Sequence, residues 1–427
     1  MCTRVHIWRD PGGRNMSITH PERVDQGTRG SLDPDGAVGQ AIENGQTLPS
    51  SWYTDDSIFE QEKHAIFRRS WEYVGHRGQV AKPGDFFTCE VGGLPIVVVC
   101  GKDMVVRAFH NICRHRHHSV AIGAGNRKLL QCNYHAWTYK LDGSFNAAPR
   151  SKEDPNFDGT PLCLKTAKVD FLGNMVFVNP SGDAPSLTEA LGPIPILARD
   201  RALPLDEATF QGRKSVDFDS NWKIVWDNNC ECYHCPTVHP SWYKTARLDG
   251  EHLYSYPIGP LQFEVVMEQY EGLRDDNSYY CWPAIFFMSS GGAGKLPDSV
   301  ADGIEEQAKQ PGFIAFRFVP ISTRETRIDV DVFSIDPLTE QQVDDWLELI
   351  LTVVREDRDV CSRVQKAHDA GGSELGTLIP GIDSEYMTQT WEKLVHRALV
   401  HPEVPMYAPI LERTDTWPPA SVPAGQS

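Results

Sequence analysis

The sequence predicts an α+β protein in which a small all-β domain precedes a larger domain of mixed helices and strands. Its 427 residues are enough for two domains with separate hydrophobic cores. Between about residues 52 and 180, short runs of β-branched and aromatic residues alternate with turn residues. From about residue 184 the pattern changes, and residues 339–364 have the apolar spacing of a long amphipathic helix.

Composition and charge exclude several classes of protein. Hydrophobic residues make up 40% and charged residues 23% of the chain, which is ordinary for a globular protein. No run is long enough to span a membrane and no secretion signal is visible, so we expect a cytoplasmic protein without membrane contact. A net charge of -17 argues against nucleic acid as a partner. The eleven scattered cysteines favour reduced thiols and metal ligation over disulfides.

Changes in composition and in apolar periodicity divide the chain into three segments. Residues 1–50 are rich in Gly, Asp, Arg and Pro and lack apolar periodicity, so we expect a mobile extension. Residues 51–183 form the predicted β domain and residues 184–427 the mixed domain. The clearest strands of the β domain are residues 86–91, 96–100, 105–109 and 175–178. Residues 101–103 and 142–143 supply hairpin turns between them.

Two short motifs in the β domain offer a mixed set of metal ligands. Cys113 and His115 are followed, after sixteen residues, by Cys132 and His135. Two thiolates and two imidazoles in matched pairs are the ligands of a Rieske [2Fe–2S] cluster, in which cysteines hold one iron and histidines the other. Trp137 is placed to supply apolar cover around the cluster. The motifs therefore predict an electron-transfer centre.

A structural zinc site is the alternative for these four residues, because two cysteines and two histidines also suit tetrahedral zinc. Zinc fingers, however, pair cysteine with cysteine and histidine with histidine. In this chain each half of the site contributes one residue of each kind. The spacing therefore favours the [2Fe–2S] cluster.

A second constellation lies in residues 221–240. Glu231 and His234 are expected one turn apart on a helix that begins near Asn221, and Pro236 is expected to end or bend that helix. His239 would then turn back toward His234. Two histidines and a later carboxylate form the facial triad of a non-haem Fe(II) oxygenase, which leaves positions open for O2. The alternative is a pair of hydrogen-bonded core histidines.

The third ligand is expected on the long helix that starts near residue 340. Thr339 and Gln342 are in the positions of a capping box at its start. Asp357 is nearly in phase with the buried Trp346, eleven residues earlier. A carboxylate on the buried face of a helix needs a partner, and iron is a suitable one. A salt bridge to a neighbouring arginine is the alternative.

These paired motifs resemble those of the α subunits of Rieske non-haem iron oxygenases, a family that hydroxylates rings and demethylates quaternary amines. The resemblance spans about residues 50–400. It implies a helix-grip (START-like) catalytic domain, in which a curved antiparallel sheet surrounds a long helix. It also implies a homotrimer in which Glu231 bridges His234 to a neighbour's His135. Each chain would hold one Rieske cluster and one mononuclear Fe(II) and would use O2 as co-substrate.

The resemblance also implies redox partners, and this chain differs from the usual family pattern at a few positions. A flavin-containing NAD(P)H reductase, directly or through a ferredoxin, would deliver electrons for the reaction on a small-molecule substrate. Family members often have glycine where this chain has His117 and Ala136. Neither departure removes a ligand. Asn228, one turn before Glu231, is expected near the iron without binding it, although a simple polar helix residue is an equal alternative.

The substrate is the least determined feature. Strand segments after residue 276 carry aromatic residues of which about half can face a cavity, and the candidates are Trp282, Phe286, Phe287 and Phe316. Aromatic walls suit a quaternary ammonium group through cation–π contacts, and they equally suit a flat ring. The Glu-Cys-Tyr-His form of the bridge is similar to that of oxygenases acting on betaines and carnitine. Hydroxylation of an aromatic compound or aromatic acid is the alternative, and a non-catalytic electron carrier is a further one.

Overall fold

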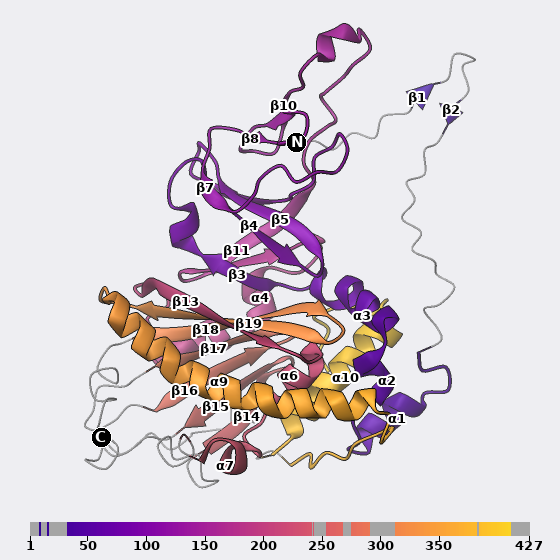
Figure 1. Cartoon of the computed structure of the whole chain (residues 1–427), viewed down its shortest axis with the longest axis vertical. Helices are drawn as coiled ribbons and strands as arrows, with labels where there is room; N and C mark the ends of the chain where they lie inside the picture. Colours follow the sequence, from indigo (N-terminus) through magenta and orange to yellow (C-terminus); the bar gives the residue numbers. More distant parts are fainter. Residues whose placement is uncertain are drawn as a thin grey trace.

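The computed structural model describes residues 32–240, 253–267, 275–290, 312–381 and 384–410, together with Trp242 and two short strands, β1 (Trp8–Arg9) and β2 (Asn15–Met16). A β domain stands on a larger domain in which helices cover a broad sheet (Figure 1). This architecture confirms the predicted α+β class. None of the described helices combines the length and apolar composition of a bilayer-spanning segment.

The β domain is built on an antiparallel sheet of seven strands in the order β3-β12-β11-β6-β5-β4-β7, with a smaller sheet in the order β10-β9-β8. All four predicted strands are present, and residues 101–103 turn between two of them. The strands are β3 (Glu72–His76), β4 (Asp85–Val91), β5 (Leu94–Cys100), β6 (Val106–His110), β7 (Ala124–Asn126), β8 (Leu130–Gln131), β9 (Thr138–Tyr139), β10 (Phe145–Ala147), β11 (Thr166–Leu172) and β12 (Met175–Asn179). Two 3-10 turns, η2 (Arg77–Val80) and η3 (Ser151–Glu153), complete the domain.

The larger domain has one antiparallel sheet of seven strands in the order β13-β19-β18-β17-β16-β15-β14. They are β13 (Thr209–Phe218), β14 (Leu253–Gly259), β15 (Gln262–Met267), β16 (Asp276–Cys281), β17 (Ile285–Ser290), β18 (Gly312–Ser322) and β19 (Glu325–Ser334). Its helices are α4 (Leu187–Leu191), α5 (Ile194–Asp200), α6 (Trp222–Asn229), α7 (Cys235–Val238), α9 (Glu340–Asp369) and α10 (Tyr386–Val400). The long α9 runs across the sheet (Figure 1), and Thr339 and Gln342 form the predicted capping box at its start.

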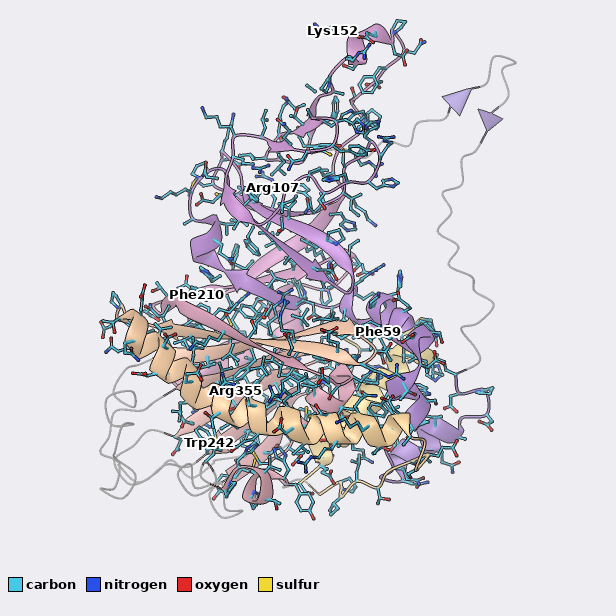
Figure 2. The ribbon with its side chains drawn as sticks, viewed as in Figure 1. Phe59, Arg107, Lys152, Phe210, Trp242 and Arg355 are labelled. Atoms are coloured by element: carbon cyan, nitrogen blue, oxygen red, sulfur yellow. The ribbon has the colours of Figure 1, made fainter. Side chains whose placement is uncertain are left out.

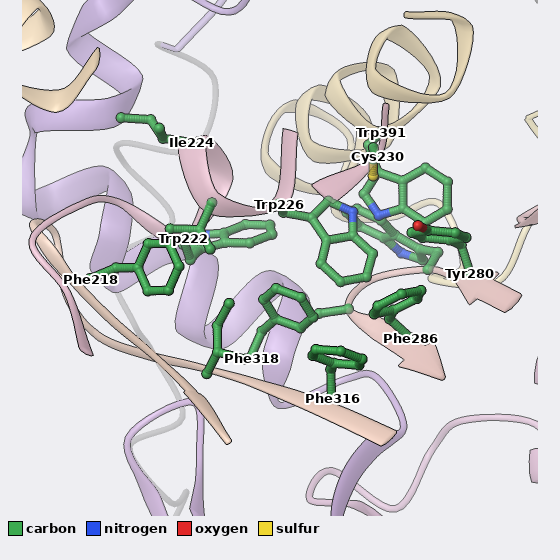
Figure 3. Packing of buried hydrophobic residues seen from close by; sticks show 14 of the residues in the cluster. Phe218, Trp222, Ile224, Trp226, Cys230, Tyr280, Phe286, Phe316, Phe318 and Trp391 are labelled. Carbon is green, nitrogen blue, oxygen red and sulfur yellow. The ribbon is translucent and has the colours of Figure 1, made fainter. Parts of the chain in front are cut away.

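Aromatic side chains fill the space between the sheet and the helices that cover it (Figure 3). Phe286 packs against Phe316 with ring centroids 4.7 Å apart, and Trp282 lies in the same cluster. Phe287 differs from the prediction, because successive residues of a strand point to opposite faces. Its ring packs against Tyr279 in the cluster on the other side of the sheet. Phe287 therefore cannot line a cavity together with Phe286.

The N-terminal segment packs in the larger domain, contrary to the prediction for residues 32–50 and for the residues just after them. It forms α1 (Ala37–Glu43), α2 (Ser50–Thr54), α3 (Asp56–Glu62) and the π-helical turn η1 (Lys63–Phe67). Ile42, Trp52 and Phe67 are buried in the cluster between sheet and helices. These apolar side chains, widely spaced along the segment, anchor it there. Apart from β1 and β2, the rest of the predicted extension lies outside the described residues.

The chain enters and leaves the β domain at neighbouring points. The backbone N–H of Ser181 donates to the carbonyl of Arg68 over 2.9 Å. The side-chain amide of Asn179 donates to the carbonyl of Ser70, also over 2.9 Å. The β domain is thus an insertion between η1 and α4 of a larger domain that begins before it and resumes after it.

Aromatic and charged contacts join the two domains. His76 stacks on Phe210 with ring centroids 4.0 Å apart, and Figure 2 shows Phe210 at the junction. The hydroxyl of Tyr73 donates to Asp331, which also accepts from the guanidinium of Arg213 over 2.6 Å. These groups are buried or half-buried, so the junction is held by direct hydrogen bonds as well as by packing.

Glu72 in β3 is expected to make stability depend on pH. Burial raises its pKa to about 8, although hydrogen bonding to Ser70 and the charge of Arg317 lower it. Below about pH 8 the folded chain keeps a proton on Glu72 that the unfolded chain loses near the ordinary value of 4.5, so stability falls as pH rises through this window. We expect the unfolding temperature of Glu72→Gln to fall less than that of the wild type between about pH 5 and about pH 9. Parallel thermal-unfolding curves in the two proteins would contradict this.

Candidate active site

Two tight turns at the far end of the β domain carry the predicted cluster ligands. In each turn the cysteine carbonyl accepts a backbone hydrogen bond, from His117 to Cys113 over 3.1 Å and from Ala136 to Cys132 over 3.0 Å. Both thiols are buried. The rings of His115 and His135, one exposed and one half-buried, lie with centroids 4.6 Å apart. The structure thus brings thiols inward and imidazoles outward on adjacent loops.

Neighbouring aromatic residues hold these loops in place. Trp137 stacks on the ring of His115 at 4.7 Å between centroids and an interplanar angle of 5°. The hydroxyl of Tyr139 accepts from the backbone N–H of Arg114 over 2.9 Å and lies 3.3 Å from the sulfur of Cys113. A hydroxyl near a thiolate ligand is one of the contacts that adjust the potential of an iron–sulfur cluster.

Two of the departures from the family pattern fall at the sharpest points of the loops. His117 has a φ of 60° and Ala136 a φ of 55°, both in the left-handed region. Glycine adopts this region freely, whereas a residue with a Cβ loses about 1 kcal/mol there. The turns therefore keep the geometry that glycine favours, at a modest cost in stability.

The second constellation is built differently from the single helix that the sequence predicts. Helix α6 ends at Asn229, and Pro236 lies in the first turn of α7 instead of ending α6. Proline is favoured there because its missing N–H has no helical partner in the first turn. Glu231 and His234 lie in the turn between the two helices, where the backbone N–H of His234 donates to the carboxylate of Glu231 over 3.0 Å.

His234, His239 and Asp357 converge, as predicted. Asp357 Oδ1 on α9 lies 2.8 Å from Nε2 of His239 and 3.3 Å from Nε2 of His234. The two Nε2 atoms are 3.2 Å apart. One ligand atom from each residue lies within 4.8 Å of the others, so the three can hold a single metal ion.

Two carboxylates orient the imidazoles for such an ion. Glu231 Oε1 lies 2.5 Å from Nδ1 of His234, and Glu356 Oε2 lies 2.8 Å from Nδ1 of His239. A carboxylate only accepts, so each Nδ1 carries a proton, and with a metal ion bound each Nε2 would offer its lone pair to that ion in place of a proton shared with Asp357. Two neutral imidazoles and one carboxylate suit Fe(II), which the residues therefore fit.

The charges around the imidazoles favour a cation at this point. Burial lowers the pKa of His234, but its hydrogen bonds to Asp357 and Glu231 outweigh burial and raise the pKa to about 10. The pKa of Asp357 is lowered by His234 and His239 in spite of burial, which acts to raise it. A divalent metal ion supplies the positive charge that this arrangement stabilises.

Two families of known domains match this chain. Residues 70–167 match the Rieske [2Fe–2S] domain, and residues 205–271 match the catalytic domain of the ring-hydroxylating α subunit. The chain is a Rieske oxygenase α subunit. This confirms the resemblance noted from the paired motifs and the predicted oxygenase class.

The matches to known relatives extend over most of this Rieske oxygenase. The carnitine monooxygenase oxygenase subunit of Acinetobacter pittii (strain PHEA-2) is 28% identical over 336 residues, which are 76% of this chain and 86% of the relative. A crystal structure of a quaternary ammonium Rieske monooxygenase with its substrate L-carnitine has a TM-score of 0.71 and 26% identity, and the match covers 84% of this chain and 97% of that one. A naphthalene 1,2-dioxygenase structure has a TM-score of 0.68 at 16% identity, over 85% of this chain and 94% of that one, and shows only that the fold is shared. The predicted helix-grip domain is confirmed.

Asn228 was predicted to lie near the iron, and its amide nitrogen lies 3.5 Å from Nε2 of His234. Other residues of the oxygenase site were not predicted from the sequence. Glu356 was not singled out, although its position next to Asp357 is a signal. Tyr53 and Glu392 were also missed, and both line a cavity of about 500 Å³ that reaches Glu231 and His234. None of the predicted aromatic residues lines that cavity.

The cluster loops and the histidine pair lie far apart within one chain of the oxygenase. Figure 1 shows β8, which directly precedes the second cluster loop, at the opposite end of the molecule from α7, which follows His234. Electron transfer between protein centres requires close approach. A single chain in this conformation therefore keeps its two candidate centres separate.

Glu356 is expected to strengthen metal binding by holding His239. In Glu356→Ala the imidazole loses its partner at Nδ1, so we expect iron affinity to fall by roughly 10–100-fold. Metal titration of the iron-depleted variant, with the cluster retained, measures this. Asp359→Ala is a matched control, because that carboxylate pairs with Arg358 at the surface of the same helix. Equal iron affinities in the two variants would show that Glu356 does not contribute to metal binding.

Proposed function

We propose that this Rieske oxygenase uses O2 and reductase-delivered electrons to hydroxylate a quaternary ammonium compound beside its nitrogen, which leads to loss of a methyl group or cleavage of a C–N bond. The observation that carries the proposal is its similarity to a carnitine monooxygenase subunit, which spans 86% of that relative. The Glu-Cys-Tyr-His sequence around Glu231 supports the same substrate class.

We infer that Cys113, Cys132, His115 and His135 hold the [2Fe–2S] cluster. The buried thiols and outward imidazoles of the two loops support this assignment. We infer further that His234, His239 and Asp357 hold a mononuclear Fe(II). Bound there, the ion would supply the O2 activation that hydroxylation needs, while the carboxylates fix the imidazole tautomers.

We also propose that the working enzyme is a homotrimer in which the His135 side of one chain meets Glu231 of its neighbour. The separation of the two sites within one chain supports this, because a partner chain can bring them together (Figure 1). One solved relative of this fold is described as using inter-subunit electron transfer, at 25% identity and a TM-score of 0.71. A flavin-containing NAD(P)H reductase, with or without a ferredoxin, is the proposed electron source.

Iron content and oxygen uptake test the proposed function together. We expect about three iron atoms per chain and, after dithionite reduction, an EPR spectrum with the low average g value of mixed His/Cys ligation. Oxygen uptake should then depend on L-carnitine or glycine betaine, with a flavin reductase as electron donor. Uptake that responds only to aromatic acids would replace the substrate class by the aromatic alternative. Two irons without uptake would indicate an electron carrier.

Glu231 is expected to limit the rate at which the two centres exchange electrons. Glu231→Gln removes the charge that orients His234 but keeps the shape of the side chain, so both metals should be retained. We expect reoxidation of the reduced cluster, followed by its absorbance in a single turnover with O2 and L-carnitine, to slow by roughly 10–100-fold. Unchanged single-turnover kinetics would show that Glu231 does not take part in electron transfer between the two centres.

A further inference from the structure

Three oxygen-bearing side chains, two of them buried and one half-buried, meet beside the candidate iron site. The hydroxyl of Tyr53 on α2 is 3.3 Å from Oδ2 of Asp227 on α6 and 3.0 Å from Oε1 of Glu392 on α10. Tyr53 and Glu392 are each 2% exposed. Three helices from distant parts of the chain therefore converge on one hydroxyl.

Counting protons shows that this group holds more than one. A tyrosine hydroxyl has a single proton and can donate it to only one of two carboxylates. The other carboxyl group forms its hydrogen bond only if it is protonated and donates to the hydroxyl oxygen. A buried and a half-buried carboxylate on one hydroxyl would also repel each other if both were ionised. At least one of Asp227 and Glu392 is therefore a neutral acid.

Glu392 is the better candidate for the neutral acid. Its second oxygen, Oε2, is buried and makes no hydrogen bond of normal geometry to the described residues. Burial and the charge of Asp227 raise the pKa of Glu392 more than Tyr53 and the backbone N–H of Leu48 lower it. Burying an unpaired oxygen costs far more for a carboxylate than for a carboxylic acid. Glu392 can thus donate to Tyr53 while Tyr53 donates to Asp227. The two hydrogen bonds then point the same way, from Glu392 toward Asp227.

The ordered chain ends at the cavity that contains the candidate iron site. Tyr53, Asp227 and Glu392 line the cavity of about 500 Å³ together with Glu231 and His234. A cavity of this size has room for several water molecules, since each takes about 30 Å³ in liquid water. Protons that leave Asp227 therefore have a route toward the histidine pair.

We propose that Glu392, Tyr53 and Asp227 form a proton relay for the oxygenase reaction, with Asp227 as the group that releases protons into the cavity. When the protonated form of Asp227 gives up its proton, Tyr53 passes its own to Asp227 Oδ2 and takes the proton of Glu392 Oε1. Glu392, which also lines the cavity, then takes up a new proton from water there before the next transfer. The relay rests on the proposed function, in which one oxygen atom of O2 enters a C–H bond and the other leaves as water. That reaction consumes two protons for the two electrons that the reductase supplies.

The charges around Asp227 favour this role. Burial raises its pKa to about 7, while Lys223 and the hydrogen bond from Tyr53 lower it, and Glu385 and Glu231 add to the rise. Lys223 is itself neutralised by the buried Glu62 over 2.5 Å.

Two further groups complete the surroundings of the relay. On α9, the ring of His368 stacks on that of Tyr53 with centroids 4.5 Å apart. The thiols of Cys230 and Cys361 are buried near Asp227, and its charge helps to raise the pKa of each. The carboxyl of Asp227 can therefore both hold and release a proton near neutral pH, and removing Tyr53 or Asp227 should change the pH dependence of turnover.

Single-turnover kinetics and infrared titration of the holoenzyme test the relay. With L-carnitine and O2, we expect product formation in the wild type to fall roughly fiftyfold between about pH 7 and about pH 9, as the protonated fraction of Asp227 falls, and to be slower in D2O. Tyr53→Phe and Asp227→Asn should lose the inflection near pH 7 and the isotope effect while keeping the iron content of the wild type. Asp359→Asn is the matched control, because that carboxylate pairs with Arg358 at the surface of α9 and does not line the cavity. It should keep both effects.

The infrared titration measures the protonation of the carboxyl groups directly and does not require substrate turnover. We expect a protonated-carboxyl stretch that persists at neutral pH in the wild type and is missing in Glu392→Gln. Absence of a Glu392-dependent band, or an unchanged pH profile in both Tyr53→Phe and Asp227→Asn, would overturn the relay. Failure of the wild type to consume O2 with any quaternary amine would count against the proposed function instead, while the infrared titration still decides whether the proton is shared.

Discussion

His234→Ala is expected to abolish turnover while the visible absorbance of the cluster stays at the wild-type level. The imidazole supplies one of the three converging ligand atoms, and its loss leaves two that cannot hold iron firmly. We expect iron to fall from about three to about two atoms per chain and substrate-dependent O2 uptake to fall by on the order of a thousandfold or more.

Metal analysis and an oxygen electrode measure both effects on one preparation. His401→Ala serves as a control, because that histidine is exposed and contacts only Glu403 at 3.4 Å among the ion pairs of the described residues. Full activity of His234→Ala would show that the histidine pair does not hold the catalytic metal. Loss of cluster colour as well would indicate that the substitution unfolds the chain.

Cys132→Ala should have the opposite pattern, with loss of the cluster. The thiol is buried, and the backbone N–H of Cys132 donates to the carbonyl of Trp137 over 2.9 Å, so the loop is poised around the sulfur. Without the thiolate the [2Fe–2S] cluster lacks one of its four ligands. We expect colourless protein, no EPR signal after reduction and no turnover with reductase.

Cys89→Ala is the matched control for this variant, since Cys89 is a half-buried cysteine on β4 of the same domain. Its colour should equal that of the wild type. A Cys132→Ala protein that keeps the cluster spectrum would refute the ligand assignment. A wild type that is colourless and contains zinc would support the zinc alternative instead.

Local spacing explains what could be predicted from the sequence. The cluster residues lie in two short loops, so their identities and separations already define the site. Asp357 was found because a helix fixes the face on which each residue lies, and its phase relative to Trp346 was visible in the apolar stripe. The same reasoning predicted four strands of the β domain within one or two residues of their ends.

Long-range contacts explain what could not be predicted. Tyr53 reaches Asp227 across 174 residues and Glu392 across 339, and no local pattern connects them. The face to which Phe287 points depends on the register of β17, which neighbouring strands set. The end of α6 at Asn229 was missed because Pro236 was taken as a helix terminator, whereas proline also starts helices.

The adjacent entry and exit points of the β domain make it a replaceable module. Because Arg68 and Ser181 are hydrogen-bonded neighbours, a β domain exchanged between them would keep the ends of the larger domain in place, provided that it retains the junction contacts made by Tyr73 and His76. A β domain from another oxygenase, joined at these two points, would bring its own cluster loops and the aromatic and hydroxyl contacts around them. The residues that line the cavity of about 500 Å³ all lie outside the exchanged segment, so the cluster domain can change, in evolution or by grafting, while those lining residues stay the same.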